Sequence, residues 1–220
     1  MKLPTQLIAV SALTLAMSSA FAADSVTLRV TGTLIAPSCE VEMPGGDTAD
    51  FGNIDRDGLN KATSTALSSA KDLTVRVDCG EAATAVSIYT TDSMVDSKPT
   101  DSRSFTFTDG TVSLESANYY GLGKASNNNP IGAYAVRVGK ISVDGTEHDV
   151  QISADNKAWN PAVGSVYFNT DTPYLSAGSA VTGKIFNFPV AVAANISAAD
   201  DLPSDEVVLN GNATIAVDYL

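Results

Sequence analysis

The apolar residues of this chain recur at every second position in many short runs, and this period constrains its fold more than any other feature. Leu73, Val75 and Val77, for example, alternate with polar residues. Such alternation is the pattern of a strand with one buried face. The same alternation, or a short β-rich run, covers 26–34, 85–89, 105–107, 134–138, 141–143, 150–152, 163–168, 185–192 and 213–219. Many short strands predict an all-β antiparallel sandwich or barrel.

Turn-forming residues separate these runs. Asp109-Gly110, Asp144-Gly145 and Asn210-Gly211 are pairs that suit tight hairpins. The best helical pattern is Asn60 to Ala70, rich in Ala, Ser and Thr, which fits a helix or a loop equally well. Residues 93–101 and 124–130 are polar and contain proline, so we expect exposed loops there.

The first residues have the organisation of a secretory signal peptide. Lys2 supplies a positive end, Leu7 to Met17 is an apolar run, and Ala20-Phe21-Ala22 offers small residues for cleavage. The run is shorter than the about 20 apolar residues that span a bilayer. We therefore expect an exported protein whose residues 1–22 are removed, with 23–220 as one domain and no membrane insertion.

The charge of the chain excludes two kinds of partner. It carries 25 acidic and 13 basic residues, a formal net charge of −12, and removal of Lys2 would make it more acidic still. Binding to phosphates depends on Lys and Arg that release counterions. Nucleic acid and anionic membrane surfaces are therefore not expected partners.

Cys39 and Cys79 are the two cysteines of the chain. In an oxidising compartment such a pair normally forms a disulfide. A bridge that closes a loop of about 40 residues stabilises a fold by about 4 kcal/mol in the chain-entropy account. A redox or metal role is disfavoured, because no CxxC spacing or histidine cluster accompanies the pair.

Several motifs in a fixed order carry a family resemblance. A glycine-containing run from Gly32 leads to Cys39, Asp50-Phe51-Gly52 follows, and the next strand ends at Cys79. The chain closes on Asn212 to Leu220, which alternates apolar residues and has a penultimate tyrosine. This order and spacing resemble the pilin subunits that a periplasmic chaperone and an outer-membrane usher assemble into adhesive fimbriae.

The resemblance implies an immunoglobulin-like sandwich that lacks its last strand. A chaperone first lends a strand to the open groove, and a neighbouring pilus subunit then replaces it. By analogy the groove here is bordered by the first and last strands, with Leu220 supplying a carboxylate near the chaperone. The implied location is the fimbrium or cell surface, after passage through the periplasm, and the implied role is in cell adhesion. The groove residues expected on this basis are Val26, Leu28, Val30, Ala213, Ile215, Val217, Tyr219 and Leu220.

Three departures from the family pattern bear on assembly. The chain is longer than a typical pilin, and we assign the excess to insertions between about Ser93 and Thr172. Val207 stands where the family usually has a glycine early in its last strand. If cleavage follows Ala22, only Ala23 to Ser25 precede the first strand, too few for a donor extension. Either Val26, Leu28 and Val30 are themselves the donor, with Gly32 at the small-residue position, or this subunit does not donate.

No pattern in the sequence predicts an enzyme, a cofactor or a metal site. Asn53 to Gly58 begins like a calcium loop, but Ser64 occupies the position of the bidentate glutamate, so an acidic turn is expected instead. His148, the single histidine, has Asp149 and Ser153 nearby in sequence. These three do not form a triad motif, and we expect a surface histidine on a hairpin.

The alternative function is an autonomous secreted carbohydrate-binding sandwich, whose extra residues would supply the missing strand. Trp159 lies near Tyr167 and Tyr174 in sequence, and aromatic faces of this kind stack on sugars. A partly buried tryptophan that packs against the core is the favoured interpretation of Trp159.

Overall fold

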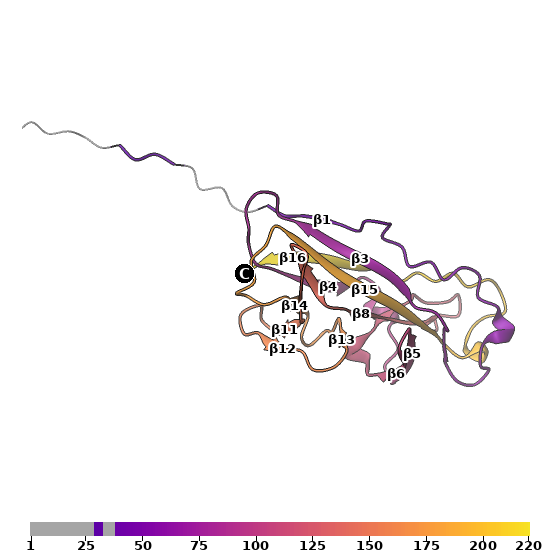
Figure 1. Cartoon of the computed structure of the whole chain (residues 1–220). Helices are drawn as coiled ribbons and strands as arrows, with labels where there is room; N and C mark the ends of the chain where they lie inside the picture. The colour runs from indigo at the N-terminus through magenta and orange to yellow at the C-terminus, as the bar shows by residue number, and fades with distance from the viewer. Residues whose placement is uncertain (1–28, 33–37) are drawn as a thin grey trace, which may run out of the picture. The chain divides into compact units, whose positions relative to one another are not determined.

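The computed structural model describes residues 29–32 and 38–220 (Figure 1). The chain divides into two units, residues 1–35 and 36–220. Residues 29–32 carry no regular structure. The rest of the strand expected over 26–34 lies outside the described residues, and so does the expected signal peptide, 1–22. No helix in the described part of the chain is long and apolar enough to cross a membrane.

The larger sheet is antiparallel and has the strand order β1-β3-β15-β8-β13. Its central strands are long, because their inward residues are valines and phenylalanines that face the core. Short strands join at its margins: β2 and β9 pair with β15, β10 with β9, and β7 with β8. The bounds are β1 Glu40–Glu42, β2 Thr65–Ala66, β3 Lys71–Asp78, β7 Tyr120–Gly121, β8 Gly132–Val138, β9 Ile141–Val143, β10 Thr146–His148, β13 Val166–Tyr167 and β15 Ile185–Ile196.

The second sheet is also antiparallel and has the order β12-β11-β14-β4-β16. Its longest pair joins β16 to β4 over seven residues, from Ala213 opposite Asp92 to Tyr219 opposite Val86. The bounds are β4 Val86–Asp92, β11 Gln151–Ser153, β12 Asn160–Pro161, β14 Tyr174–Ser176 and β16 Ala213–Tyr219.

The connectivity of the main strands is that of an immunoglobulin-like sandwich. In that fold one sheet has the order A-B-E-D and the other has C-F-G. Here β1, β3, β15 and β8 take the places of A, B, E and D, while β4 and β16 take those of C and F. Among the described residues β16 pairs with β4 alone, so no described strand occupies the position of G. The predicted all-β sandwich is confirmed.

The main core lies between the two sheets. Val75 and Phe188 from the larger sheet and Ile88 and Leu175 from the smaller one are completely buried. Each such side chain contributes about 1.5–3 kcal/mol through its removal from water. These residues are the apolar members of the alternating runs. The alternation in the sequence therefore predicts which side chains form this core.

A hairpin covers the other face of the larger sheet. It consists of β5 (Arg103–Phe107) and β6 (Gly110–Leu114). Its Phe105 and Phe107 pack against small outward residues of β8 and β15 and form a second core. The buried members of this second core are Phe105, Phe107, Leu114, Tyr119, Ala133, Ala135 and Ala193.

Most of the predicted turns and loops are confirmed. The turn between β5 and β6 contains Asp109, with Gly110 as the first residue of β6, and Asp144-Gly145 joins β9 to β10. The ambiguous segment Asn60 to Ala70 is a loop that contains β2 and no helix. The run 163–168 forms only the short β13, and Val163 is 96% exposed. Single 3-10 turns are present at η1 Arg56–Gly58, η2 Val95–Ser97, η3 Ser116–Asn118 and η4 Ala199–Asp201.

The predicted disulfide is present between Cys39 and Cys79. Cys39 precedes β1 and Cys79 follows β3, so the bridge closes one end of this strand pair. Disulfides form in oxidising compartments and are rare in the cytosol. The bridge therefore indicates a protein that lies outside the cytoplasm. His148 ends β10, on a hairpin as expected.

Candidate functional site

A deep apolar groove opens between the two sheets beside β16. Its volume is about 770 Å³. Its floor consists of core residues, each at most 8% exposed, so the groove reaches down to the apolar interior of the protein. The floor residues are Leu122, Ile131, Tyr134, Val136, Phe168, Val190, Val192 and Ile196.

One bank of the groove is the last strand and the segment before it. Ala213 and Ile215 of β16 line the groove, and Val207 and Leu209 continue this bank upstream. Gly211 is required between them, because a Cβ at this position would lie 2.8 Å from Cε1 of Tyr134. A side chain there would displace the Tyr134 ring from the floor.

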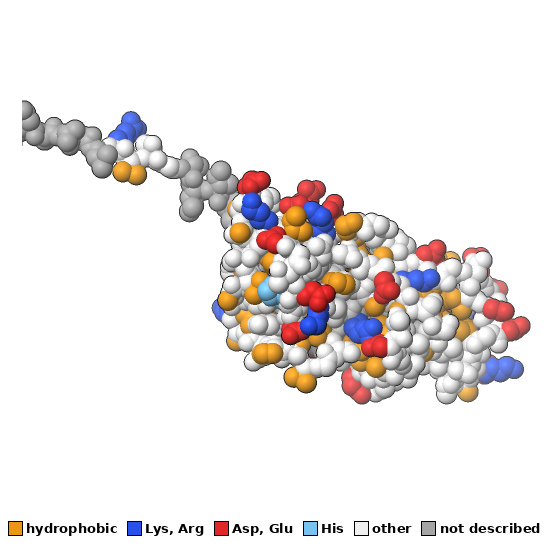
Figure 2. Space-filling model, viewed as in Figure 1, with side chains coloured by type: hydrophobic (Ala, Val, Ile, Leu, Met, Phe, Trp, Pro, Cys, Tyr) orange, Lys and Arg blue, Asp and Glu red, His pale blue; other side chains and the backbone are white. Residues whose placement is uncertain are grey.

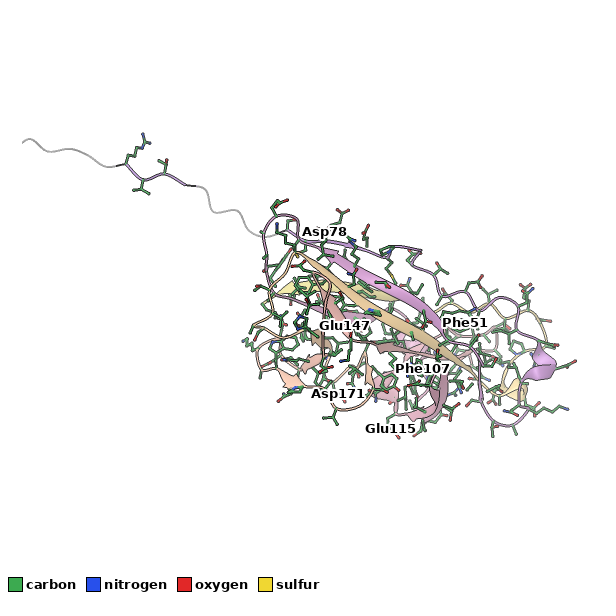
Figure 3. The ribbon with its side chains drawn as sticks, in the orientation of Figure 1. Phe51, Asp78, Phe107, Glu115, Glu147 and Asp171 are labelled. Atoms are coloured by element: carbon green, nitrogen blue, oxygen red, sulfur yellow. A yellow bond between two sulfur atoms is a disulfide. The ribbon has the colours of Figure 1, made fainter. Side chains whose placement is uncertain are left out.

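The opposite bank is the segment from Met43 to Leu59, which sequence reasoning did not assign to the groove. Asp50-Phe51-Gly52 forms a tight turn, in which the Gly52 N–H donates to Asp50 Oδ1 at 2.7 Å and Gly52 has a φ of 64°. The turn directs the half-buried Phe51 toward the core, beside the start of β3 (Figure 3). The signal for this bank was the Asp-Phe-Gly motif itself, which carried the family resemblance.

The remaining predicted residues of the last strand lie beyond the groove. Val217 packs against the core. Tyr219 is 43% exposed, and its hydroxyl accepts a hydrogen bond of 2.8 Å from the Cys39 N–H. The Leu220 N–H donates to the Ala85 carbonyl at 3.0 Å. The end of β16 is thus tied to the disulfide end of the larger sheet.

The first predicted strand, 26–34, lies largely outside the described residues. Val26 and Leu28 lie outside the described residues, and Val30 is 86% exposed. Their expected roles as groove residues or as a donated strand stay predictions.

Two tyrosines form the polar part of the floor. The rings of Tyr120 and Tyr134 lie 5.4 Å apart, and the Tyr120 hydroxyl is hydrogen-bonded to the Thr90 hydroxyl. Burial raises the pKa of Tyr120 to about 12. Burial also raises the pKa of Tyr134, with smaller contributions from Asp92 and Tyr120. Both shifts favour the neutral hydroxyl, as an apolar floor requires.

Charged residues line the banks rather than the floor. The carboxylates are those of Asp47, Asp50, Asp205 and Glu206, and the one cation of the lining is Arg56. The Arg56 guanidinium donates to the backbone carbonyls of Ala199, Leu202 and Pro203. It thereby fastens η1 to the segment that follows β15. Figure 2 shows acidic side chains spread among apolar ones on the visible face.

This arrangement suits the addition of a strand. The outer edge of β16 has no hydrogen-bonded strand among the described residues, and such an edge offers a row of free N–H and C=O groups. The adjacent floor offers apolar contacts to every second side chain of an extended segment. Backbone pairing would supply affinity and the floor would supply specificity.

Comparisons with known proteins give one family and two relatives. Residues 28–135 match the model of a family described as a protein of unknown function, DUF1120. The uncharacterized protein YhcF of Escherichia coli K12 is 28% identical over 227 residues, covering 92% of this chain and 93% of the relative. Protein GltF of the same organism is 27% identical over 250 residues, covering 96% and 95%. Both similarities extend over nearly the full length of each protein.

Proposed function

We propose that this protein is a structural subunit, or a fimbria-like component, of a chaperone–usher adhesive pilus, completed by a strand that another protein donates. The observation that carries the proposal is the apolar groove beside β16, at the position that strand G occupies in a complete sandwich. The order of Cys39, the Asp-Phe-Gly turn, Cys79 and the tyrosine-ended last strand supports it.

In this proposal the groove is filled in two stages. A periplasmic chaperone lends a strand while the subunit folds, and a neighbouring subunit replaces that strand after delivery to the outer-membrane usher. An open edge left unfilled would promote aggregation, so protection during export is required. The role is structural, with no catalysis, cofactor or metal, and the final location is the fimbrium or cell surface.

The test is to export the protein with and without a fimbrial chaperone and to measure whether the two purify as a one-to-one complex. Ile215→Lys places a charge in the groove and is expected to abolish the complex. Thr214→Lys is the matched control, since Thr214 is exposed on the other face of the same strand. It is expected to leave the complex intact.

Two results would contradict the proposal. One is a stable monomer that folds without the chaperone and never binds it, as the carbohydrate-binding alternative predicts. The other is a complex that Ile215→Lys leaves unchanged, because binding would then occur away from the groove.

A further inference from the structure

The two banks of the groove carry acidic side chains that have no counter-charge in the described structure. Asp47 and Asp50 lie on one bank, and Asp205 and Glu206 on the other. All four are exposed. None takes part in an ion pair within residues 38–220. The groove is therefore apolar at its floor and negative along both edges.

The one cation of the lining is held in a structural role. Arg56 directs its guanidinium to three backbone carbonyls rather than to these carboxylates. An extended occupant would place alternate side chains on the floor and the intervening ones outward, near the level of the banks. Long cationic side chains at these outward positions would reach the carboxylates, and acidic ones would be repelled.

We propose that the groove selects a strand whose inward side chains are apolar and whose outward side chains are lysine or arginine. This inference rests on the proposed function and adds the chemistry of the partner strand. Rim charges act mainly on encounter rate and specificity and are screened by salt. The selection is therefore strong at low ionic strength and weak at high ionic strength.

The test uses two labelled synthetic peptides that share alternating valine and leucine and differ only in outward residues, lysine in one and glutamate in the other. Binding to the purified exported protein is followed by fluorescence anisotropy at low and high salt. The lysine peptide is expected to bind at least about tenfold more tightly at low salt, with the difference reduced at high salt. Neutralising the banks is expected to remove the preference. The bank variant is D47N, D50N, D205N and E206Q.

A second variant separates the banks from the overall negative charge. It removes the same number of carboxylates from positions outside the groove lining. Two of these, Glu147 and Asp171, are seen in Figure 3 away from Phe51, which marks one bank of the groove. This variant is expected to retain the preference for the lysine peptide. Its substitutions are D96N, D149N, D171N and E147Q.

The outcomes distinguish this inference from the proposed function. Equal binding of both peptides, blocked by Ile215→Lys, would overturn the charge selection and leave the groove as a strand site. Equal loss of preference in both carboxylate variants would also overturn it, because general attraction would then explain binding. Failure of both peptides to bind at any salt would overturn the strand site and the inference together.

Discussion

Arg103 illustrates how single residues fix the hairpin to the sheet. This residue is only 9% exposed, and Nη1 donates to Asn195 Oδ1 at 3.1 Å and to Ser197 Oγ at 3.2 Å. Asp101 accepts from the same guanidinium at 3.3 Å. A buried charge with these partners is costly to remove, because the groups around it lose their hydrogen bonds.

Arg103→Ala is therefore expected to lower the free energy of unfolding by about 2–3 kcal/mol, the cost of leaving the buried polar groups of Asn195 and Ser197 without this partner. Urea denaturation measures it. Arg76→Ala is the control, because Arg76 pairs with Glu42 and Asp78 on the surface. That control is expected to cost about 1 kcal/mol or less, and equal losses in the two variants would contradict the assigned role of Arg103.

Because of Tyr120, we expect the folded protein to lose stability at alkaline pH. Burial raises the pKa of Tyr120 from 10.0 to about 12, so the folded state holds the proton more tightly than the unfolded state. The resulting stabilisation is complete below about pH 10 and is lost as the pH rises toward 12, by about 3 kcal/mol in total. Urea denaturation between these pH values is expected to show a shallower decline for Tyr120→Phe. An unchanged slope would contradict the prediction.

At the scale of elements, the strands predicted best from the sequence are those with one face toward solvent. β9 and β16 begin and end where the alternation does. β8 and β15 extend past the predicted runs, because their ends are buried on both faces and the sequence there is alanine-rich without alternation. Four strands, β1, β2, β7 and β12, have only two or three residues. They form because a neighbouring strand pairs with them, so no local sequence pattern predicts them.

Of the residues that the sequence assigned to a groove, Ala213 and Ile215 line the groove described here. Alternation alone identifies these inward residues of the last strand. The other bank, Met43 to Leu59, has no period and is placed by the Asp50 turn and by long-range contacts of Arg56. Spacing in sequence cannot reveal such contacts.

The β5–β6 hairpin is expected to be a major source of stability. Phe105→Ala removes a completely buried ring from the second core and is expected to cost about 3–5 kcal/mol. Thr111→Ala, at an exposed position of the same hairpin, is expected to change stability by less than about 1 kcal/mol. Thermal denaturation of the two variants compares them, and a Phe105→Ala variant as stable as Thr111→Ala would show that the hairpin is dispensable.

For the whole molecule, the disulfide compensates for a sandwich with an open edge. Cys39 and Cys79 are 40 residues apart in sequence, and their bridge links the ends of β1 and β3. The Tyr219 hydroxyl is hydrogen-bonded to the Cys39 N–H at the same end. A cross-link of this span restricts the unfolded chain and so favours the folded one.

Replacing both cysteines by serine is expected to lower the free energy of unfolding by about 4 kcal/mol. Urea denaturation under oxidising and reducing conditions measures this. The reductant should destabilise the parent protein and leave the serine variant unaffected. A parent protein indifferent to reduction would contradict the prediction.

The second core also has a consequence for how the sequence can vary between relatives. Because the hairpin covers the outer face of β8 and β15, Ala133, Ala135 and Ala193 have neighbours where a surface strand would have water. Larger residues there would displace the hairpin, and polar ones would be buried without partners. Among the described strands, the sequences of β8 and β15 should therefore vary least between relatives. The sequence of β12, which is exposed, should vary more.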